Sequence, residues 1–178
     1  MTTQRLVSLI GMPTTGKTKV GKELAKALGC TLVDIDDRIM QCYGESTIQK
    51  VIDRLADTFT DAEGRITIET VDSLSGPTVI ATGGSIVYNE PAMAFLRAKT
   101  HIVYLRATYE TIDRRVKRRE RRGAGTGIVY GPNETLYDLY KRRTPLYERY
   151  AHRIVDTDRN RGKIACRLAL RLAQEQIA

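Results

Sequence analysis

The sequence contains no apolar run approaching the roughly 18 to 20 residues that a membrane-spanning helix requires. Its first five residues lead directly into a short apolar stretch without a cleavage-site pattern, so we expect no signal peptide. Cysteine is scarce: the three residues are odd in number and form no C-x-x-C pair, which argues against a disulfide framework or a zinc site. Buried thiols in a reducing compartment fit this usage better, and we expect a cytoplasmic protein without a membrane partner.

Internal repeats, low-complexity segments and a domain linker are also absent from the sequence. With 178 residues, 42% of them hydrophobic, the chain is long enough to bury a core, and we predict a single domain over 1–178. The formal charge of +8 is uneven, because residues 1–100 hold 11 Lys/Arg against 12 Asp/Glu whereas residues 101–178 hold 18 against 9. The basic excess in the C-terminal part favours a polyanionic partner, either nucleic acid or nucleotide phosphates.

Short apolar runs alternate with helical patterns along the chain, which predicts an α/β fold with a mainly parallel sheet. The expected strands are Leu6–Ile10, Thr31–Ile35, Thr78–Ala81, His101–Leu105 and Arg153–Asp156. The expected helices are Lys17–Leu28, one or two within Arg38–Asp57, Ile66–Leu74, Ala92–Ala98, Thr108–Arg122, Glu134–Tyr150 with an interruption at Pro145, and Lys163–Ile177. Four glycines in nine residues make Gly123–Gly131 the best candidate for a mobile loop.

The strongest motif is Gly11-Met-Pro-Thr-Thr-Gly-Lys-Thr18, a match to G-x-x-x-x-G-K-[ST] between the first expected strand and helix. Its glycines let the backbone turn tightly around a phosphate, and the helix N-terminus favours the negative charge. Lys17 would reach the β- and γ-phosphates, and the Thr18 hydroxyl would ligate Mg²⁺. The motif predicts a nucleotide-binding site made by Gly11, Thr14, Thr15, Gly16, Lys17 and Thr18.

A cluster of carboxylates, Asp34-Ile-Asp36-Asp37, follows at the end of the second expected strand. Alternation along a strand points Asp34 and Asp36 the same way, and the carboxyl ends of parallel strands are where such sheets bind ligands. One carboxylate near a metal and another near an accepting hydroxyl would suit phosphoryl transfer. Asp36 or Asp37 is also well suited to cap the next helix, and both roles can hold for adjacent residues, although the functional role is favoured for the pair.

Three segments in order along the chain carry a family resemblance. Residues 16–37 (GKTKVGKELAKALGCTLVDIDD) resemble the first helix and D-x-D strand end of the shikimate kinases. Residues 81–85 (ATGGS) resemble the glycine triplet of that family. Residues 143–147 (RTPLY), which are followed by Tyr-Ala and Val-Asp-Thr, resemble its R-x-P-L-Y helix and last strand. The resemblance spans nearly the whole chain. It implies a three-layer P-loop kinase fold whose central five-stranded parallel sheet has the order 2-3-1-4-5. It also implies helices on both faces of the sheet, a mobile lid over about 119–133 and acceptor-binding helices over about 36–75.

The resemblance also implies an activity, the transfer of a phosphoryl group from ATP, with Mg²⁺, to a hydroxyl of shikimate or a related small metabolite. Asp34 would hold the Mg²⁺ shell together with Thr18. Asp36 would orient the accepting hydroxyl and serve as its base, and Arg119 would contact the nucleotide. The implied catalytic residues are Lys17, Asp36 and Arg119, and the implied acceptor-binding residues are Asp36, Arg65, Gly83, Gly84 and Arg143.

The chain departs from the family pattern at four places. The lid arginine of an R-P-L-L motif is missing, because alignment on Gly131-Pro132 leaves Thr126-Gly-Ile-Val129 there. The F-R-x-x-E motif is shifted, with Arg65 four residues before Glu69 instead of three. Ser85 replaces the third glycine of the triplet, and Thr14 stands where the P-loop usually has glycine. Since three of these departures touch the acceptor side, the kinase scaffold is better supported than the identity of the acceptor.

Two other functions stay open beside a monomeric small-molecule kinase. The basic run 114–122 could clamp ATP beside the lid or form a nucleic-acid stripe, although charge runs are usually solvated faces. Nucleic acid is the less favoured partner, because no aromatic interleaving accompanies the charge. A nucleoside, nucleotide or polynucleotide kinase would use this charge. A GTPase-like switch has weaker support, since Asp61-Ala-Glu-Gly64 matches only a loose D-x-x-G and no N-K-x-D occurs.

Overall fold

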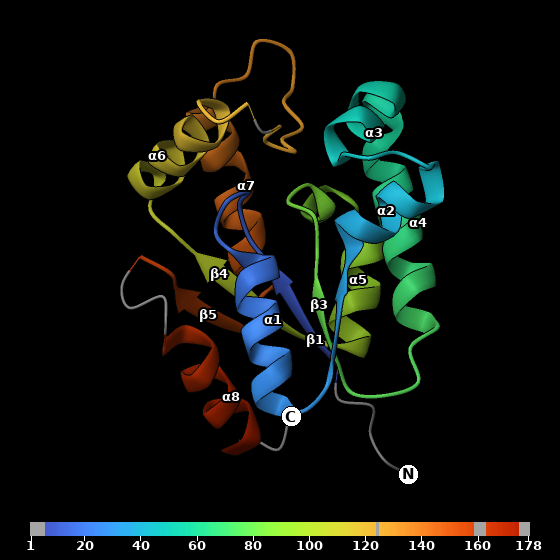
Figure 1. The fold of residues 1–178 in the computed structure, drawn as a ribbon, viewed down its shortest axis with the longest axis vertical. Coiled ribbons are helices and arrows are strands. Elements are labelled where there is room, and N and C mark those ends of the chain that lie inside the picture. Colours follow the sequence, from blue (N-terminus) through green and yellow to red (C-terminus); the bar gives the residue numbers. More distant parts are fainter. Residues whose placement is uncertain (1–5, 124, 159–162, 175–178) are drawn as a thin grey trace.

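The computed structural model describes residues 6–123, 125–158 and 163–174 of the chain. Five strands in this part form one parallel sheet in the order β2-β3-β1-β4-β5 (Figure 1). They are β1 (Leu6–Ile10), β2 (Thr31–Asp34), β3 (Thr78–Ala81), β4 (His101–Arg106) and β5 (Arg153–Asp156). The predicted α/β class, the five-stranded parallel sheet and its strand order are confirmed.

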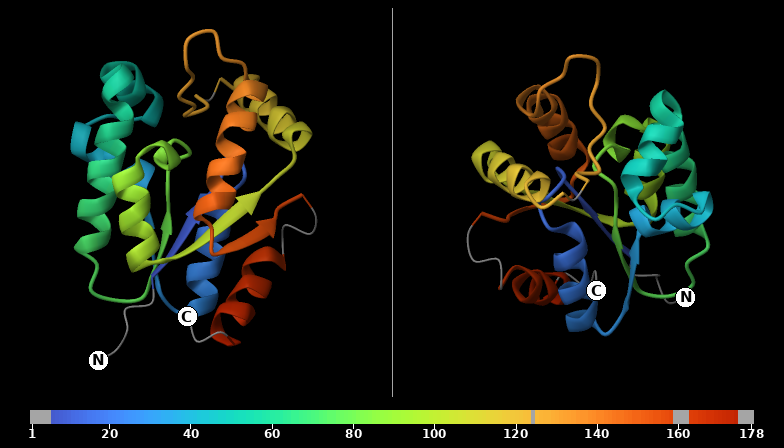
Figure 2. Two further views of the ribbon diagram at one scale, coloured as in Figure 1. Left: turned by 180° about the vertical axis from the view of Figure 1, so that it is seen from behind. Right: turned by 45° about the horizontal axis from the view of Figure 1, so that its top comes forward.

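Helices cover both faces of the sheet, so the fold has three layers. The helices are α1 (Lys17–Leu28), α2 (Ile35–Tyr43), α3 (Ile48–Leu55), α4 (Phe59–Asp72), α5 (Glu90–Lys99), α6 (Tyr109–Glu120), α7 (Leu136–Tyr150) and α8 (Ile164–Gln174), with short 3-10 helices η1 (Ala56–Thr58) and η2 (Ile86–Tyr88). Helices α1 and α8 pack together on one face, and α5 and α7 lie on the other (Figures 1 and 2). None of the described helices is both long and apolar enough to span a membrane.

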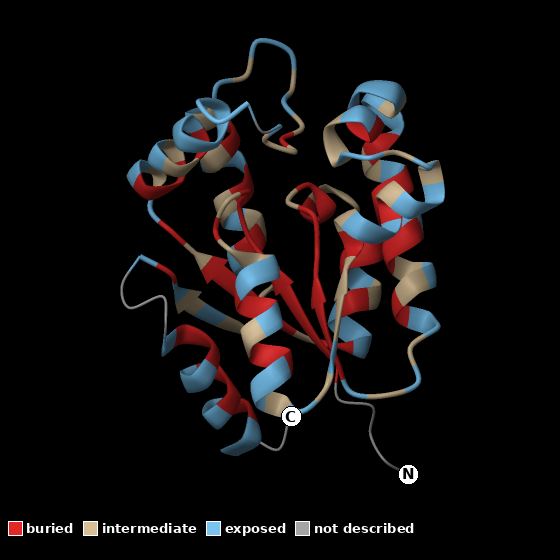
Figure 3. Ribbon diagram, in the orientation of Figure 1, coloured by how far each residue is buried: buried red, intermediate tan, exposed pale blue. Residues whose placement is uncertain are grey.

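Two hydrophobic cores lie between these layers. Leu9 and Ile10 are successive residues of β1, both fully buried, and they belong to different cores because strand side chains alternate between faces. Helices on both faces explain why β1 and β3 are buried throughout, whereas the edge strands β2 and β5 are partly exposed (Figure 3). The central strands therefore read as continuous apolar runs in the sequence.

The carboxyl ends of the parallel strands meet at one edge of the sheet, and the segments that carry the motifs leave the sheet there. The lid, which we define as residues 121–123 and 125–135 between α6 and α7, reaches from α6 toward α3 above this edge (Figure 1). Gly127 lies so close to α3 that a Cβ there would be 3.0 Å from a methyl carbon of Ile48. Ile128 is only 3% exposed and belongs to the core. In this structure the lid is thus packed against the body of the protein.

Three local expectations are wrong. Helix α4 begins at Phe59 instead of Ile66, because Gly64 does not end a helix here but leaves room for the Asn89 side chain packed against α4. Helix α7 runs through Pro145 without a break, since Pro145 is exposed and the carbonyl that loses its partner can face water. The thiols were expected to be buried, but Cys42 and Cys166 are exposed and Cys30 is only half-buried.

Candidate active site

The P-loop joins β1 to α1 at the carboxyl edge of the sheet. Gly11 has a φ of 146°, and a Cβ there would lie 2.7 Å from the carbonyl oxygen of Leu105, so only glycine fits. Thr14 stands where glycine is usual, and it adopts the left-handed conformation of this tight turn with a φ of 65°. Lys17 Nζ donates to the carbonyls of Gly11 at 2.8 Å and Met12 at 3.1 Å. The ammonium is therefore held over the loop, where it would meet phosphate oxygens.

A hydroxyl and a carboxylate meet beside the P-loop, and they are the two residues expected at the metal. Thr18 Oγ1 donates to Asp34 Oδ2 at 2.7 Å. Asp34 Oδ1 accepts the backbone N–H of Asp36 at 3.0 Å, so Asp34 caps α2 and Asp36 and Asp37 do not. Mg²⁺ prefers such hard oxygen ligands and usually completes its shell with water and substrate phosphates. The donor set of Thr18 and Asp34 therefore fits Mg²⁺ bound together with a nucleotide.

Asp36 lies in the first turn of α2 and faces the same cleft as Lys17. Removal from water raises the pKa of its carboxyl to about 6, the neighbouring charge of Asp34 adds to the rise, and Lys17 opposes it. Removal from water also lowers the pKa of Lys17 to about 8, although Asp36 and Asp34 favour its charged form. Both groups therefore change charge close to neutral pH, as is common for residues that transfer protons or bind charged substrates.

These two groups predict a bell-shaped pH dependence of kcat/KM for ATP. As the base expected from the family resemblance, Asp36 would act when ionised, so the rate should rise as the pH increases through about 6. As the expected phosphate-binding residue, Lys17 would act when protonated, so the rate should fall as the pH increases through about 8. Steady-state rates between pH 5 and 9.5 measure both limbs. A rate that stays level from pH 7.5 to 9.5 would contradict the assignment of Lys17.

A second buried carboxylate, that of Glu63 on α4, enters the site and was missed in the sequence. Its Oε2 accepts a hydrogen bond from Ser85 Oγ at 2.6 Å, and its Oε1 has no partner among the described residues. Complete burial raises the pKa of this carboxyl to about 7, and the hydrogen bond from Ser85 opposes the rise. A Cβ on Gly83 would collide with the carboxylate, which explains the glycine there.

The structure places Arg65 outside the site. Its side chain is 60% exposed and pairs with Glu69 at 3.4 Å, one turn further along the outer face of α4. The expectation that Arg65 binds the acceptor is therefore wrong. Glu63 lies four residues after Phe59, which is the spacing of phenylalanine and glutamate in F-R-x-x-E, so this signal could have found it. The same alignment puts Thr60 where that motif has arginine.

Replacing Glu63 by glutamine is expected to change how stability depends on pH. Because the folded-state pKa of Glu63 is raised from 4.5 to about 7, its stabilising contribution is complete below pH 4.5 and is lost as the pH rises through 7. Relative to pH 4.5, Glu63→Gln should gain up to about 3 kcal/mol over the original chain at pH 8.5. Urea denaturation across this range measures the gain. The exposed Glu69→Gln is the control on the same helix, and parallel profiles for Glu63→Gln and the original chain would refute the expectation.

Arg143, on α7, is the residue that the family resemblance assigns to the acceptor, and it is only 1% exposed. Its Nε donates to the Tyr88 hydroxyl at 3.1 Å, and its Nη2 donates to the lid carbonyl of Val129 at 2.9 Å. A Cβ on Gly84 would lie 3.1 Å from Nη1, so the guanidinium closely approaches the glycine segment after β3. The Tyr147 hydroxyl donates to the Gly84 carbonyl at 2.6 Å and fixes that segment.

Two arginines of α6 line the cleft beside the P-loop, and only one of them was singled out from the sequence. Arg119 Nε donates to the Gly125 carbonyl at 2.6 Å. Arg115 was missed, although its Nη1 donates to the Thr14 carbonyl of the P-loop at 3.0 Å. The four-residue spacing places both on one helix face. Arg114 and Arg118 have the same spacing, so the basic run alone does not single out the pair.

One cleft of about 390 Å³ joins most of these residues. It is lined by the P-loop and Lys17, by Asp36, Gly84 and both α6 arginines, and by the lid at Thr126 and Gly127. Arg143 and Glu63 lie beside it, near enough to influence the charge of Lys17. The arrangement can bind the phosphates of a nucleotide at one end and, at the other, hold a hydroxyl beside a carboxylate and an arginine.

Comparisons with known proteins agree with this geometry. The family model described as shikimate kinase matches residues 13–173. A shikimate kinase of Paracidovorax citrulli (strain AAC00-1) is 34% identical over 163 residues, which make up 91% of this chain and 87% of that protein. One from Histophilus somni (strain 2336) is 32% identical and covers 92% of each chain. The solved structure of shikimate kinase from Acinetobacter baumannii in complex with shikimate is similar with a TM-score of 0.79, at 29% identity, over 98% of this chain and 94% of that one.

Proposed function

Because the chain belongs to the shikimate kinase family, we propose that it transfers the γ-phosphate of ATP to a hydroxyl of shikimate, giving shikimate 3-phosphate, or to a related small hydroxylated metabolite. The observation that carries this proposal is the grouping of Lys17, Asp36 and Arg143 at one cleft. The charges of Asp36 and Arg143 both act on the Lys17 ammonium. A phosphate-binding amine, a carboxylate of raised pKa and a carboxylate-binding arginine are what this transfer requires.

The chain's own residues would perform the transfer mainly by positioning and by neutralising charge. The P-loop amides and Lys17 bind the β- and γ-phosphates, and Arg115 and Arg119 approach them from α6. Thr18 and Asp34 would hold Mg²⁺, which supplies further neutralisation of the phosphate charge and orients the phosphoryl group. The closed lid excludes water, which would otherwise compete with the acceptor hydroxyl for the phosphoryl group.

Asp36 and Arg143 would act on the acceptor. Asp36 orients the reacting hydroxyl and takes its proton as the new O–P bond forms, and its pKa of about 6 leaves it ionised at neutral pH. Arg143 binds a carboxylate of the acceptor through the part of its guanidinium that faces Gly84. Glu63 lies beside both residues and, with a pKa of about 7, limits the negative charge of the site.

The decisive experiment measures ADP release from Mg²⁺-ATP with and without shikimate, with phosphorus NMR to identify the product. We expect turnover that depends on shikimate and yields a phosphate monoester. Nucleosides, nucleotides and single-stranded DNA ends, tested in parallel, address the alternative acceptors. Turnover with one of these and none with shikimate would overturn the proposed acceptor and keep the kinase scaffold. A monomer and a cytoplasmic location stay predictions, and sedimentation velocity checks the first.

A further inference from the structure

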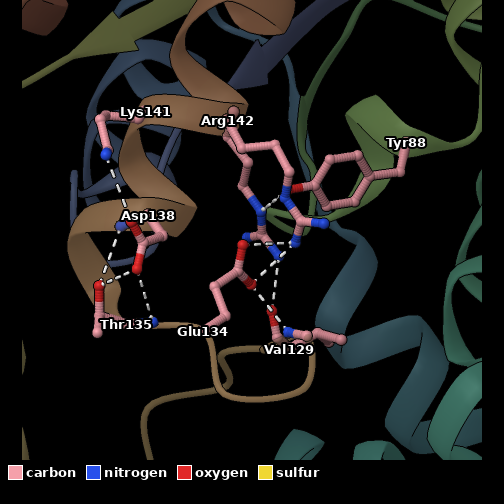
Figure 4. Close-up of polar contacts among 9 residues, drawn as sticks. Tyr88, Val129, Glu134, Thr135, Asp138, Lys141 and Arg142 are labelled. Atoms are coloured by element: carbon pink, nitrogen blue, oxygen red, sulfur yellow. Dashed lines mark hydrogen bonds and ion pairs between the residues drawn. The ribbon is translucent and has the colours of Figure 1, made fainter.

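A continuous series of side-chain contacts links Glu134, at the end of the lid, through Arg142 and Tyr88 (Figure 4) to Arg143. The Glu134 carboxylate accepts a hydrogen bond from Arg142 Nη2 at 2.8 Å. The Arg142 guanidinium lies over the Tyr88 ring, with Cζ 4.8 Å from the centroid. The Tyr88 hydroxyl accepts from Arg143 Nε, and Arg143 also lies over the same ring at 5.1 Å. Four residues from the lid, α7 and η2 thus form one connected unit.

The lid end of this unit is a hydrogen-bonded turn over residues 131–134. Its first residue, Gly131, accepts the backbone N–H of Glu134 at 3.2 Å and donates its own N–H to Glu134 Oε2 at 2.8 Å. Pro132 and Asn133, whose φ is 55°, occupy the two central positions, where a type II turn favours proline and then a residue of positive φ. The Glu134 side chain therefore locks the turn that ends the lid as well as binding Arg142.

Burial distinguishes the Glu134–Arg142 pair from ordinary surface ion pairs. The Arg142 side chain is 51% exposed but the Glu134 side chain only 10%, whereas both partners of the neighbouring Lys141–Asp138 pair are half exposed. Taking the cation away from a carboxylate that is largely shielded from water costs much folding free energy, whereas an exposed ion pair contributes little to stability. Glu134 therefore restrains the guanidinium of Arg142, which lies over Tyr88.

Arg143 receives its orientation at the other end of the unit. Tyr88 fixes the Nε edge of its guanidinium, and the lid carbonyl of Val129 fixes Nη2. The remaining nitrogen, Nη1, is directed toward Gly84 and the acceptor side. A planar guanidinium binds a carboxylate well only when its plane is correctly set, so contacts on its other edges influence acceptor affinity.

We propose that Tyr88 and Glu134 are positioning residues that orient Arg143 for the acceptor and couple this orientation to the closed lid. This inference rests on the proposed function, because it assumes that Arg143 binds the acceptor. Tyr88 acts directly through its hydroxyl, and Glu134 acts through Arg142 and the ring of Tyr88. The two residues should therefore influence the acceptor by one shared route.

A double-mutant cycle tests the shared route. Tyr88→Phe removes the hydroxyl and keeps the ring, while Glu134→Gln removes the charge and keeps an oxygen for the Gly131 N–H. Each variant should raise the acceptor KM about fivefold, with kcat and the ATP KM changed less than about twofold. Two independent effects would multiply to a rise of roughly 25-fold, and the double variant should raise the acceptor KM by much less than that. A full product, or kcat falling as much as KM rises, would overturn the proposal.

Matched controls and a second measurement keep the test independent of turnover. Tyr137→Phe and Glu148→Gln make the same chemical changes at exposed positions of α7 and should leave the kinetics unchanged. Hydrogen exchange of the ligand-free protein should show that Tyr88→Phe speeds exchange in the lid peptide around 128–131, because Arg143 then holds Val129 less firmly. If no acceptor is phosphorylated but lid exchange responds, the proposed function fails and the coupling of Tyr88 to the lid stands. Unchanged lid exchange would overturn the coupling.

Discussion

Replacing Asp36 by asparagine is expected to lower kcat by roughly a thousandfold while nucleotide affinity stays within about twofold. Asparagine has nearly the same shape but cannot take a proton from the accepting hydroxyl. The substitution leaves the backbone N–H of residue 36 in place, so its hydrogen bond to Asp34 and the cap of α2 are retained. Steady-state turnover gives kcat, and calorimetric titration with ADP and Mg²⁺ gives nucleotide affinity.

The adjacent Asp37 provides the matched control for this prediction. Asp37→Asn makes the same chemical change one residue along α2, at an exposed position outside the cleft, and should keep full activity. Equal losses of turnover and nucleotide affinity in Asp36→Asn would instead assign Asp36 to the metal. Near-normal turnover would remove it from the proton transfer.

Local patterns predicted the parts of the site that depend on neighbouring residues in the chain. The P-loop could be recognised because its function resides in consecutive backbone groups between β1 and α1, so spacing alone defines it. The position of Asp34 at the end of β2 could also be inferred, since carboxyl ends of parallel strands share an edge. The five strands could be predicted from short apolar runs, because helices on both faces of the sheet bury the central strands completely.

The parts that escaped the sequence depend on packing between distant elements. Glu63 becomes a site residue only because α4 packs against η2 and brings it within hydrogen-bonding distance of Ser85. The spacing from Phe59 to Glu63 matches the family motif, but the residue pattern around Glu63 does not show that this glutamate is buried rather than solvated, as most are. Arg115 similarly acquires its role from the contact of α6 with Thr14, 101 residues earlier in the chain. Such pairings are determined by tertiary structure and leave only weak periodicity in the sequence.

The acceptor end of the site has lost positive charge relative to the family pattern described above. Threonine stands at both arginine positions, as Thr60 on α4 and Thr126 in the lid. Arg142, the neighbour of the acceptor arginine, is already paired with Glu134. Arg143 must therefore contribute a large share of the attraction for an acceptor carboxylate, and its substitution should have a correspondingly large effect.

Arg143→Lys is expected to raise the acceptor KM about 30-fold and to change the ATP KM less than about twofold. Lysine keeps the positive charge but loses the planar fork, and with it the hydrogen bonds to Tyr88 and Val129 that set its orientation. Initial rates with each substrate varied in turn separate the two constants, and thermal denaturation verifies folding. Arg149→Lys, at an exposed position on the same helix, is the control. An acceptor KM unchanged by Arg143→Lys would show that charge alone suffices, and an equal rise in both constants would move Arg143 to the nucleotide side.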